Sequence, residues 1–129
     1  MNRVSGSGPD ARAVAMQRTG KLGTFASSLG QEAVGVGIGF AMLDDDVLVP
    51  SYREQAAQFL RGTTMAQVLL YWGGDERGSD FRGAARKDFP NSVPIGTQVP
   101  HAVGAAYALK LARKPNAVVT VFGDGGSSK

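Results

Sequence analysis

The chain has 129 residues, of which 43% are hydrophobic and 19% charged, and its net charge is +3. This length suits one domain, and the composition is that of a globular rather than a disordered chain. The positive charge is small and forms no basic run, which excludes a nucleic-acid-binding stripe but is compatible with a small phosphorylated ligand. The absence of cysteine excludes disulfides and thiolate metal sites, and no apolar run predicts a membrane span or a secretory signal.

The first twenty residues predict a flexible segment followed by a helix. Residues 1–8 are polar and rich in Gly and Ser, so we expect them to be flexible and residues 9–129 to be the folded part. Pro9 and Asp10 favour the start of a helix, and Gly20 is a suitable residue to end it.

The next two elements are predicted to be buried. From about Gln31 to Met42 the sequence is apolar on all sides of a helix and contains several glycines, which predicts a buried and closely packed helix. The short apolar run from Val47 to Pro50 predicts a buried strand that proline ends.

Two short helices and a long loop follow. Residues 54–61 predict one helix, which Gly62 should end, and Thr63 with Thr64 should cap another helix over residues 65–72. Residues 73–94 are rich in Gly, Asp and Arg, so we expect a long surface loop whose charged side chains are solvated.

The last part of the chain predicts a helix and a second strand. Thr97 should cap an alanine-rich helix over residues 98–113, and residues 117–121 form a β-branched run typical of a buried strand. Helices that alternate with strands indicate the α/β class with a parallel sheet. Because two parallel strands do not make a stable sheet by themselves, we expect the chain to be part of a larger domain.

A glycine-rich junction, Gly123-Asp124-Gly125-Gly126, follows the second strand. Such a junction places backbone N–H groups and a carboxylate at the carboxyl edge of a parallel sheet, where α/β proteins bind phosphorylated ligands. Two roles remain open for Asp124: its carboxylate could cap the following helix, or it could bind a hard cation such as Mg²⁺ together with a phosphate.

Tyr52 and Arg53 follow the first strand in a comparable way. They could be surface residues, or they could bind a phosphate that Asp124 reaches through a metal ion. The second possibility requires the two strands to be neighbours. His101 is the only histidine, and we expect it to be a packing or interface residue rather than a catalytic base.

Four motifs, taken together in their order and spacing, give the chain a resemblance to a known family. They are Gly30-Gln31-Glu32-Ala33, Ser51-Tyr52-Arg53-Glu54, Val93-Pro94-Ile95-Gly96-Thr97-Gln98-Val99-Pro100 and Gly123-Asp124-Gly125-Gly126-Ser127-Ser128-Lys129. From about Asp10 onward the chain resembles the alpha subunit of the thiamine-diphosphate-dependent 2-oxo acid dehydrogenases, the decarboxylating component of the pyruvate and branched-chain complexes. The stretch from Tyr71 to Gly78 is most similar to bacterial pyruvate-type members.

The resemblance implies an incomplete thiamine-diphosphate-binding fold, with a parallel sheet and flanking helices, that holds thiamine diphosphate and Mg²⁺. It implies that Asp124 binds Mg²⁺, that Tyr52 and Arg53 contact the diphosphate, and that Val93 and Ile95 meet the aminopyrimidine ring. The residues implied to bind the cofactor are Tyr52, Arg53, Val93, Ile95, Gly123, Asp124, Gly125 and Gly126. In some members, positions matching Ser92, Pro94, Thr97 and Gln98 hold a monovalent cation, and Phe25 would line the substrate entrance.

The resemblance also implies that other parts of the family's site lie outside this chain. In the family a second protein ligand of Mg²⁺ and a catalytic histidine come later in the alpha subunit, a further helix comes earlier, and the glutamate that activates the cofactor belongs to the beta subunit. We therefore expect a chain truncated at both ends, without catalytic residues of its own and inactive when isolated.

The implied parent activity is the oxidative decarboxylation of a 2-oxo acid, in the first place pyruvate, with acyl transfer to lipoamide. The implied partners are the beta subunit, in an α₂β₂ heterotetramer, and the lipoyl-bearing acyltransferase component. The implied location is the cytoplasm of a bacterium or the mitochondrial matrix of a eukaryote. Alternatives are a branched-chain or acetoin dehydrogenase, a non-catalytic remnant or interaction module with the alpha-subunit packing surface, and an unrelated phosphate-binding α/β domain.

Overall fold

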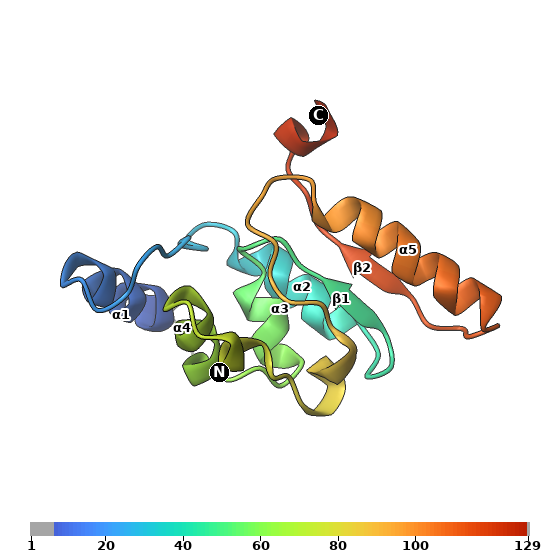
Figure 1. Ribbon diagram of the computed structural model, residues 1–129, viewed down its shortest axis with the longest axis horizontal. Helices are drawn as coiled ribbons and strands as arrows, with labels where there is room; N and C mark the ends of the chain where they lie inside the picture. Colours follow the sequence, from blue (N-terminus) through green and yellow to red (C-terminus); the bar gives the residue numbers. More distant parts are fainter. Residues whose placement is uncertain (1–6, 129) are drawn as a thin grey trace.

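The computed structural model describes residues 7–128, and Figure 1 shows how their elements are arranged. In chain order the elements are α1 (Ser7–Arg18), α2 (Glu32–Ala41), β1 (Val47–Val49), α3 (Gln55–Leu60), α4 (Met65–Trp72), η1 (Glu76–Ser79), η2 (Gly83–Lys87), α5 (Gln98–Leu111), β2 (Val118–Thr120) and η3 (Asp124–Ser128), where η marks a short 3-10 helix. Most of the segment expected to be flexible, residues 1–6, lies outside the described part of the chain. Among the described helices, none has the length and apolar character needed to cross a membrane.

The two strands lie side by side and run parallel (Figure 1). Val47 pairs with Val118, Leu48 with Val119 and Val49 with Thr120. The chain between them passes through α3, α4, the long loop and α5, and α5 packs against both strands. The predicted α/β class with a parallel sheet is therefore confirmed for residues 7–128, where the sheet has two strands.

Two apolar clusters hold these elements together. The first joins α1 to α4, and its buried members are Ala13, Leu22, Val68 and Trp72. In this cluster the Trp72 ring meets the rings of Phe25 and Tyr71 edge to face, with centroids 5.7 and 5.5 Å away. The second cluster joins β1 to α5 through Val47, Val49 and Ala102. Burial of apolar surface therefore sets both α1 against α4 and α5 against the sheet.

Two helix ends follow the local chemistry expected from the sequence, and a third does not. Gly62, the second residue after α3, takes a φ of +102°, a conformation that glycine adopts without strain. Thr64 caps α4 in a capping box with Gln67, in which Thr64 Oγ1 accepts the Gln67 N–H and Gln67 Oε1 accepts the Thr64 N–H. The prediction that Thr97 caps α5 is wrong, because its backbone is already helical and its side chain makes no capping hydrogen bond.

Two predictions of burial are also wrong in this structure. Gly35 is the one buried residue of α2, and the Phe40 side chain is 77% exposed. All three residues of β2 are half-buried. The reason is the number of neighbours: α2 packs mainly against α3 on one face, and among the described residues β2 has a strand partner on one edge.

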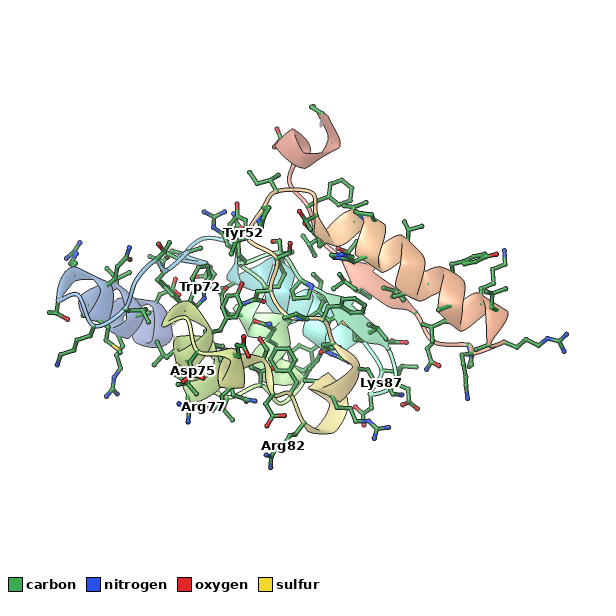
Figure 2. The ribbon with its side chains drawn as sticks, in the orientation of Figure 1. Tyr52, Trp72, Asp75, Arg77, Arg82 and Lys87 are labelled. Atoms are coloured by element: carbon green, nitrogen blue, oxygen red, sulfur yellow. The ribbon has the colours of Figure 1, made fainter. Side chains whose placement is uncertain are left out.

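The long loop is ordered and contains η1 and η2. Figure 2 shows Asp75, Arg77, Arg82 and Lys87 along its outer side, as expected for solvated charges. Asp75 pairs with Arg77, and the hydrogen bond from the Arg77 side chain lowers the pKa of Asp75 to about 2. Lys87 pairs with Asp45 and so ties η2 to the turn before β1.

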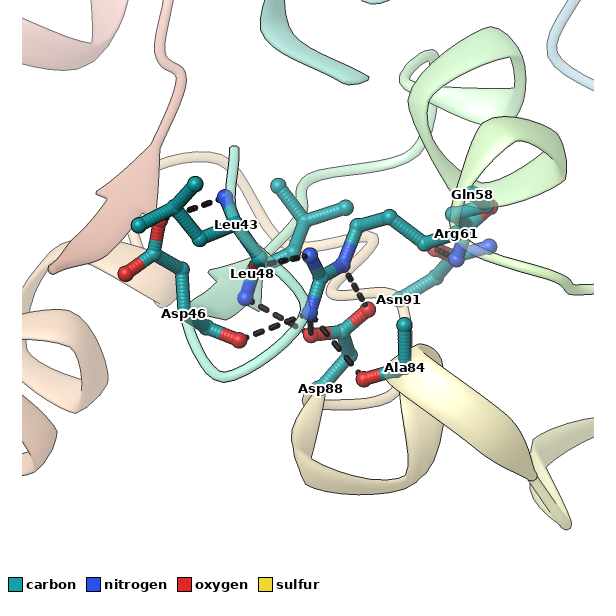
Figure 3. A network of polar contacts seen from close by, with 8 residues as sticks. All are labelled: Leu43, Asp46, Leu48, Gln58, Arg61, Ala84, Asp88 and Asn91. Atoms are coloured by element: carbon teal, nitrogen blue, oxygen red, sulfur yellow. Dashed lines mark hydrogen bonds and ion pairs between the residues drawn. The ribbon is translucent and has the colours of Figure 1, made fainter. Parts of the chain in front are cut away.

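Asp88, in the same loop, contradicts the expectation of a solvated side chain. Its side chain is 3% exposed, and its carboxylate forms a bidentate ion pair with the equally buried side chain of Arg61, which follows α3 (Figure 3). Asp88 also accepts the N–H of Leu48 in β1 at 2.8 Å. The Phe89 N–H then donates to the Leu48 carbonyl, and the Ser92 N–H to the Ser51 carbonyl. The ion pair therefore anchors a segment that follows the free edge of β1 towards Ile95.

Candidate functional site

The segments that follow β1 and β2 meet at one edge of the sheet. Because the strands are parallel and in register, both carboxyl ends reach the same side. Ser51 to Glu54 and Val121 to Gly126 line a common pocket of about 400 Å³, together with Gln31, Val34 and Ile95. The two strands must be neighbours if Tyr52, Arg53 and Asp124 are to share a site. The structure fulfils this condition.

The loop before α5 forms the third wall of this pocket. The methyl Cγ2 of Ile95 lies 3.6 Å from the position that a Cβ on Gly126 would occupy. Gly96, with a φ of +86°, makes the turn that brings the loop to this point. Val93 is 48% exposed and does not line the pocket, so the structure brings together seven of the eight residues expected to bind the cofactor.

Glu54 organises the turn after β1, and sequence reasoning assigned it no role. Its side chain is buried and accepts hydrogen bonds from the Ser51 N–H at 2.8 Å and the Ser51 hydroxyl at 2.9 Å. The pattern Ser51-x-x-Glu54 before a helix is that of a capping box, which is the signal that could have identified it. Glu54 therefore stabilises the turn that contains Tyr52 and Arg53.

Arg53 is fixed at one end and available at the other. Its Nε–H donates to the Ser27 carbonyl at 3.0 Å, and its guanidinium carbon lies 4.8 Å from the centre of the Tyr52 ring. Within residues 7–128, no ion pair involves Arg53. The positive charge is thus available to an anion in the pocket.

Asp124 is exposed and begins η3. In the described residues, no N–H group donates to its carboxylate, so the capping role that the sequence left open has no support here. Nor does this part of the chain gather three His, Cys, Asp or Glu side chains into a metal-binding group. A cation bound by Asp124 would therefore take its other ligands from outside residues 7–128, and bound phosphate groups commonly supply them to Mg²⁺.

Several other residues from the sequence analysis lie outside the pocket. His101 is exposed on α5, and its ring stacks on Phe89 at 6.1 Å, as expected for a packing residue. Phe25 lies against Trp72 rather than at the pocket. Gln98 is buried and donates to the Val121 carbonyl at 2.7 Å, while its Oε1 has no partner among residues 7–128.

Comparison with known proteins identifies the family of this chain. The family model described as "Dehydrogenase E1 component" matches residues 3–129. The chain belongs to the dehydrogenase E1 component family. This match agrees with the resemblance inferred from the four motifs.

Curated relatives in this family include alpha subunits of two kinds of dehydrogenase. The chain is 40% identical over 120 residues to a pyruvate dehydrogenase E1 component subunit alpha from Mycoplasma genitalium, covering 93% of this chain and 33% of the relative. It is 37% identical over 125 residues to the protein of the same name from Acholeplasma laidlawii, covering 97% and 36%. It is 37% identical over 124 residues to 2-oxoisovalerate dehydrogenase subunit alpha 2, mitochondrial, from Arabidopsis thaliana, covering 88% and 26%. The chain thus spans between about a quarter and a third of the length of these relatives.

Proposed function

We propose that this chain forms the part of a 2-oxo acid dehydrogenase alpha subunit that binds thiamine diphosphate and Mg²⁺, on an incomplete thiamine-diphosphate-binding fold. One observation carries the proposal. The segments after two parallel strands, far apart in the sequence, line a single pocket with the loop that bears Ile95. This arrangement brings together residues from all four motifs on which the family resemblance rests, with Gln31 representing the first.

The residues present fit a diphosphate. Arg53 would contact it with its guanidinium group, and Tyr52 with its hydroxyl. Gly125 would offer its backbone N–H group. Gly126 would do so in exchange for the hydrogen bond that its N–H donates to the Gly123 carbonyl at 2.9 Å. A Cβ placed on Gly123 or Gly125 would have no atom within 4 Å, so the backbone there is open to a ligand. Ile95 would hold the organic part of the cofactor from the third wall, and Val93 would contribute its carbonyl.

The charges of the pocket fit a metal ion as well. Its lining carries one cationic side chain, Arg53, and two carboxylates, Glu54 and Asp124. A diphosphate would add further negative charge, so its binding requires a divalent cation. Asp124, exposed and without a hydrogen bond to its carboxylate from residues 7–128, would hold Mg²⁺ between itself and the diphosphate.

The substrate that we propose is pyruvate, because the pyruvate dehydrogenase relatives reach 40% identity and the 2-oxoisovalerate relatives 37%. Thiamine diphosphate would supply the chemistry of decarboxylation, while the residues of this chain hold and orient it. The partners that we propose are a beta subunit, in an α₂β₂ heterotetramer, and a lipoyl-bearing acyltransferase. The proposed compartment is the cytoplasm of a bacterium, or the mitochondrial matrix in a eukaryote.

Isothermal titration of the 129-residue chain with thiamine diphosphate, with Mg²⁺ or with EDTA, tests the proposal. We expect binding with Mg²⁺ only, and a loss of affinity of about tenfold or more in Asp124→Ala, equivalent to about 1.4 kcal/mol. Asp80→Ala is the matched control, because this carboxylate is exposed and lies outside the pocket. Binding that persists in EDTA, or an Asp124→Ala variant with unchanged affinity, would contradict the proposal.

A second candidate, a non-catalytic interaction module, is favoured by the exposed apolar side chains of α5. Val103, Tyr107 and Leu111 follow one another at four-residue spacing and are 65%, 62% and 68% exposed. Exposed apolar stripes of this kind are typical of surfaces that bind other proteins. Co-purification with a beta subunit, combined with no binding of thiamine diphosphate in the titration above, would favour this candidate over the first.

A further inference from the structure

Asp10 is a buried carboxylate in the first half of α1, a helix whose side chains are mostly exposed to water. The residue is 4% exposed. A carboxylate is costly to bury unless it is hydrogen-bonded. One oxygen of Asp10, Oδ2, accepts two hydrogen bonds from the loop between α1 and α2: from the Ser27 hydroxyl at 2.7 Å and from the Ser28 N–H at 3.0 Å. Asp10 thus fixes both the side chain of Ser27 and the backbone that follows it.

The same short loop receives Arg53 from the pocket. Arg53 Nε–H donates to the carbonyl of Ser27, the residue whose hydroxyl Asp10 holds. Gln55 supports the neighbouring carbonyl, because its Nε2 donates to Ala26 at 3.2 Å. Figure 1 shows the loop leaving α1 and running to the centre of the molecule, where α2 and β1 lie. A continuous series of hydrogen bonds therefore leads from α1 to the cationic group of the pocket.

The fixed end of Arg53 determines the direction of its other end. A guanidinium group is planar, so a hydrogen bond at Nε sets the plane in which the two terminal nitrogens lie. In the described part of the chain, those terminal nitrogens have no protein partner. They remain available to a ligand, in an orientation that depends on the position of the Ser27 carbonyl.

We propose that Asp10 is a positioning residue for Arg53: through Ser27 and Ser28 it sets the orientation in which the guanidinium group meets an anion in the pocket. The identity of the anion as a diphosphate rests on the proposed function, but the link from Asp10 to Arg53 does not. The anion site is thereby coupled to α1, a helix that does not line it.

The first experiment observes the link without a ligand. The Arg53 Nε–H of the 129-residue chain is followed by ¹⁵N NMR, and its rate of exchange with water is measured. In Asp10→Ala we expect exchange to be about tenfold faster, the effect of weakening one hydrogen bond. Asp10→Asn should exchange like the parent chain, because a single amide oxygen at the Oδ2 position can accept both bonds. Asp44→Ala, which removes an exposed carboxylate outside the pocket, is the control.

The second experiment measures the consequence for binding, with Mg²⁺ and inorganic diphosphate as the probe. We expect Asp10→Ala to weaken binding about tenfold, because Arg53 then meets the anion in a less defined orientation, an effect comparable to the loss of one hydrogen bond. In an Arg53→Ala background the same substitution should have no further effect, because the residue it positions is absent. Ser27→Ala, which removes only the hydroxyl, provides a second test should Asp10→Ala fail to fold, and it should weaken binding in the same direction.

The outcomes separate the two proposals. Unchanged Arg53 exchange in Asp10→Ala and Ser27→Ala, or losses of affinity that add fully to that of Arg53→Ala, would overturn the positioning role. If the parent chain binds no diphosphate with Mg²⁺, the proposed function fails, and the exchange rates still decide whether Asp10 positions Arg53.

Discussion

Arg61 is the residue with the most extensive polar contacts in the described chain. Its guanidinium group donates to both oxygens of Asp88 and to the carbonyl oxygens of Leu43, Asp46 and Ala84. A buried ion pair contributes little to stability relative to an apolar replacement of both partners, but removing one partner leaves a buried, unpaired charge.

We predict that Arg61→Ala lowers the free energy of unfolding by about 3–5 kcal/mol, because Asp88 then stays buried without its counter-ion. Urea denaturation followed by circular dichroism measures this change. Arg82→Ala is the control: Arg82 pairs with Asp80 at the surface, with side chains 86% and 69% exposed, so its loss should cost no more than about 0.5 kcal/mol. If the two variants had the same free energy of unfolding, the hydrogen bonds of Arg61 would not contribute the predicted stability.

Helix α2 presents two different surfaces at the scale of a secondary-structure element. Gly35 and Gly39 face α3, and a Cβ on Gly35 would lie 2.9 Å from the Ala56 Cβ. A Cβ on Gly37, between them, would have no atom within 4 Å. Glycine therefore allows close packing of α2 against α3 at two positions, whereas at Gly37 no neighbouring atom requires it.

This difference predicts opposite effects for the same substitution in one helix. Gly35→Ala should lower the free energy of unfolding by about 1–3 kcal/mol, because the added methyl pushes α2 and α3 apart. Gly37→Ala should raise it by up to about 1 kcal/mol, because alanine favours the helix and meets nothing. Thermal and urea unfolding of the two variants measure the signs. A stabilising Gly35→Ala would mean that α3 can move aside without cost.

At the scale of the whole molecule, the positions of the side chains that could act as an acid or a base determine whether the chain could be catalytic. The pocket is lined by an arginine and two carboxylates but by no histidine, and His101 is exposed on α5 against Phe89. A general base must lie within hydrogen-bonding reach of the atom it serves, and His101 does not line the pocket.

We predict that the 129-residue chain alone releases no CO₂ from pyruvate in the presence of thiamine diphosphate and Mg²⁺, even where titration shows that it binds both. Release of ¹⁴CO₂ from labelled pyruvate is the measurement, with a complete pyruvate dehydrogenase in the same assay as the positive control. CO₂ release above background that Asp124→Ala abolishes would prove the isolated chain to be catalytic.

The sequence by itself determined the class of the fold, the place of its helices and strands, and the residue types of the pocket. These features depend on local signals: apolar periodicity, glycine at helix ends, and the four motifs. The sequence therefore predicted, to within a few residues, the end of α3 near Gly62, the start of β1 at Val47 and the start of α4 at Met65.

Only the tertiary structure decided which of these pieces are neighbours. The pairing of β1 with β2 united Arg53 with Asp124, and the burial of Asp88 and Asp10 depended on Arg61 and Ser27, each at least seventeen residues away. The exposure of α2 likewise depended on what packs beside it. A local sequence pattern indicates which secondary structure a segment prefers. Burial and strand pairing also depend on segments far away in the sequence, which a local pattern does not identify.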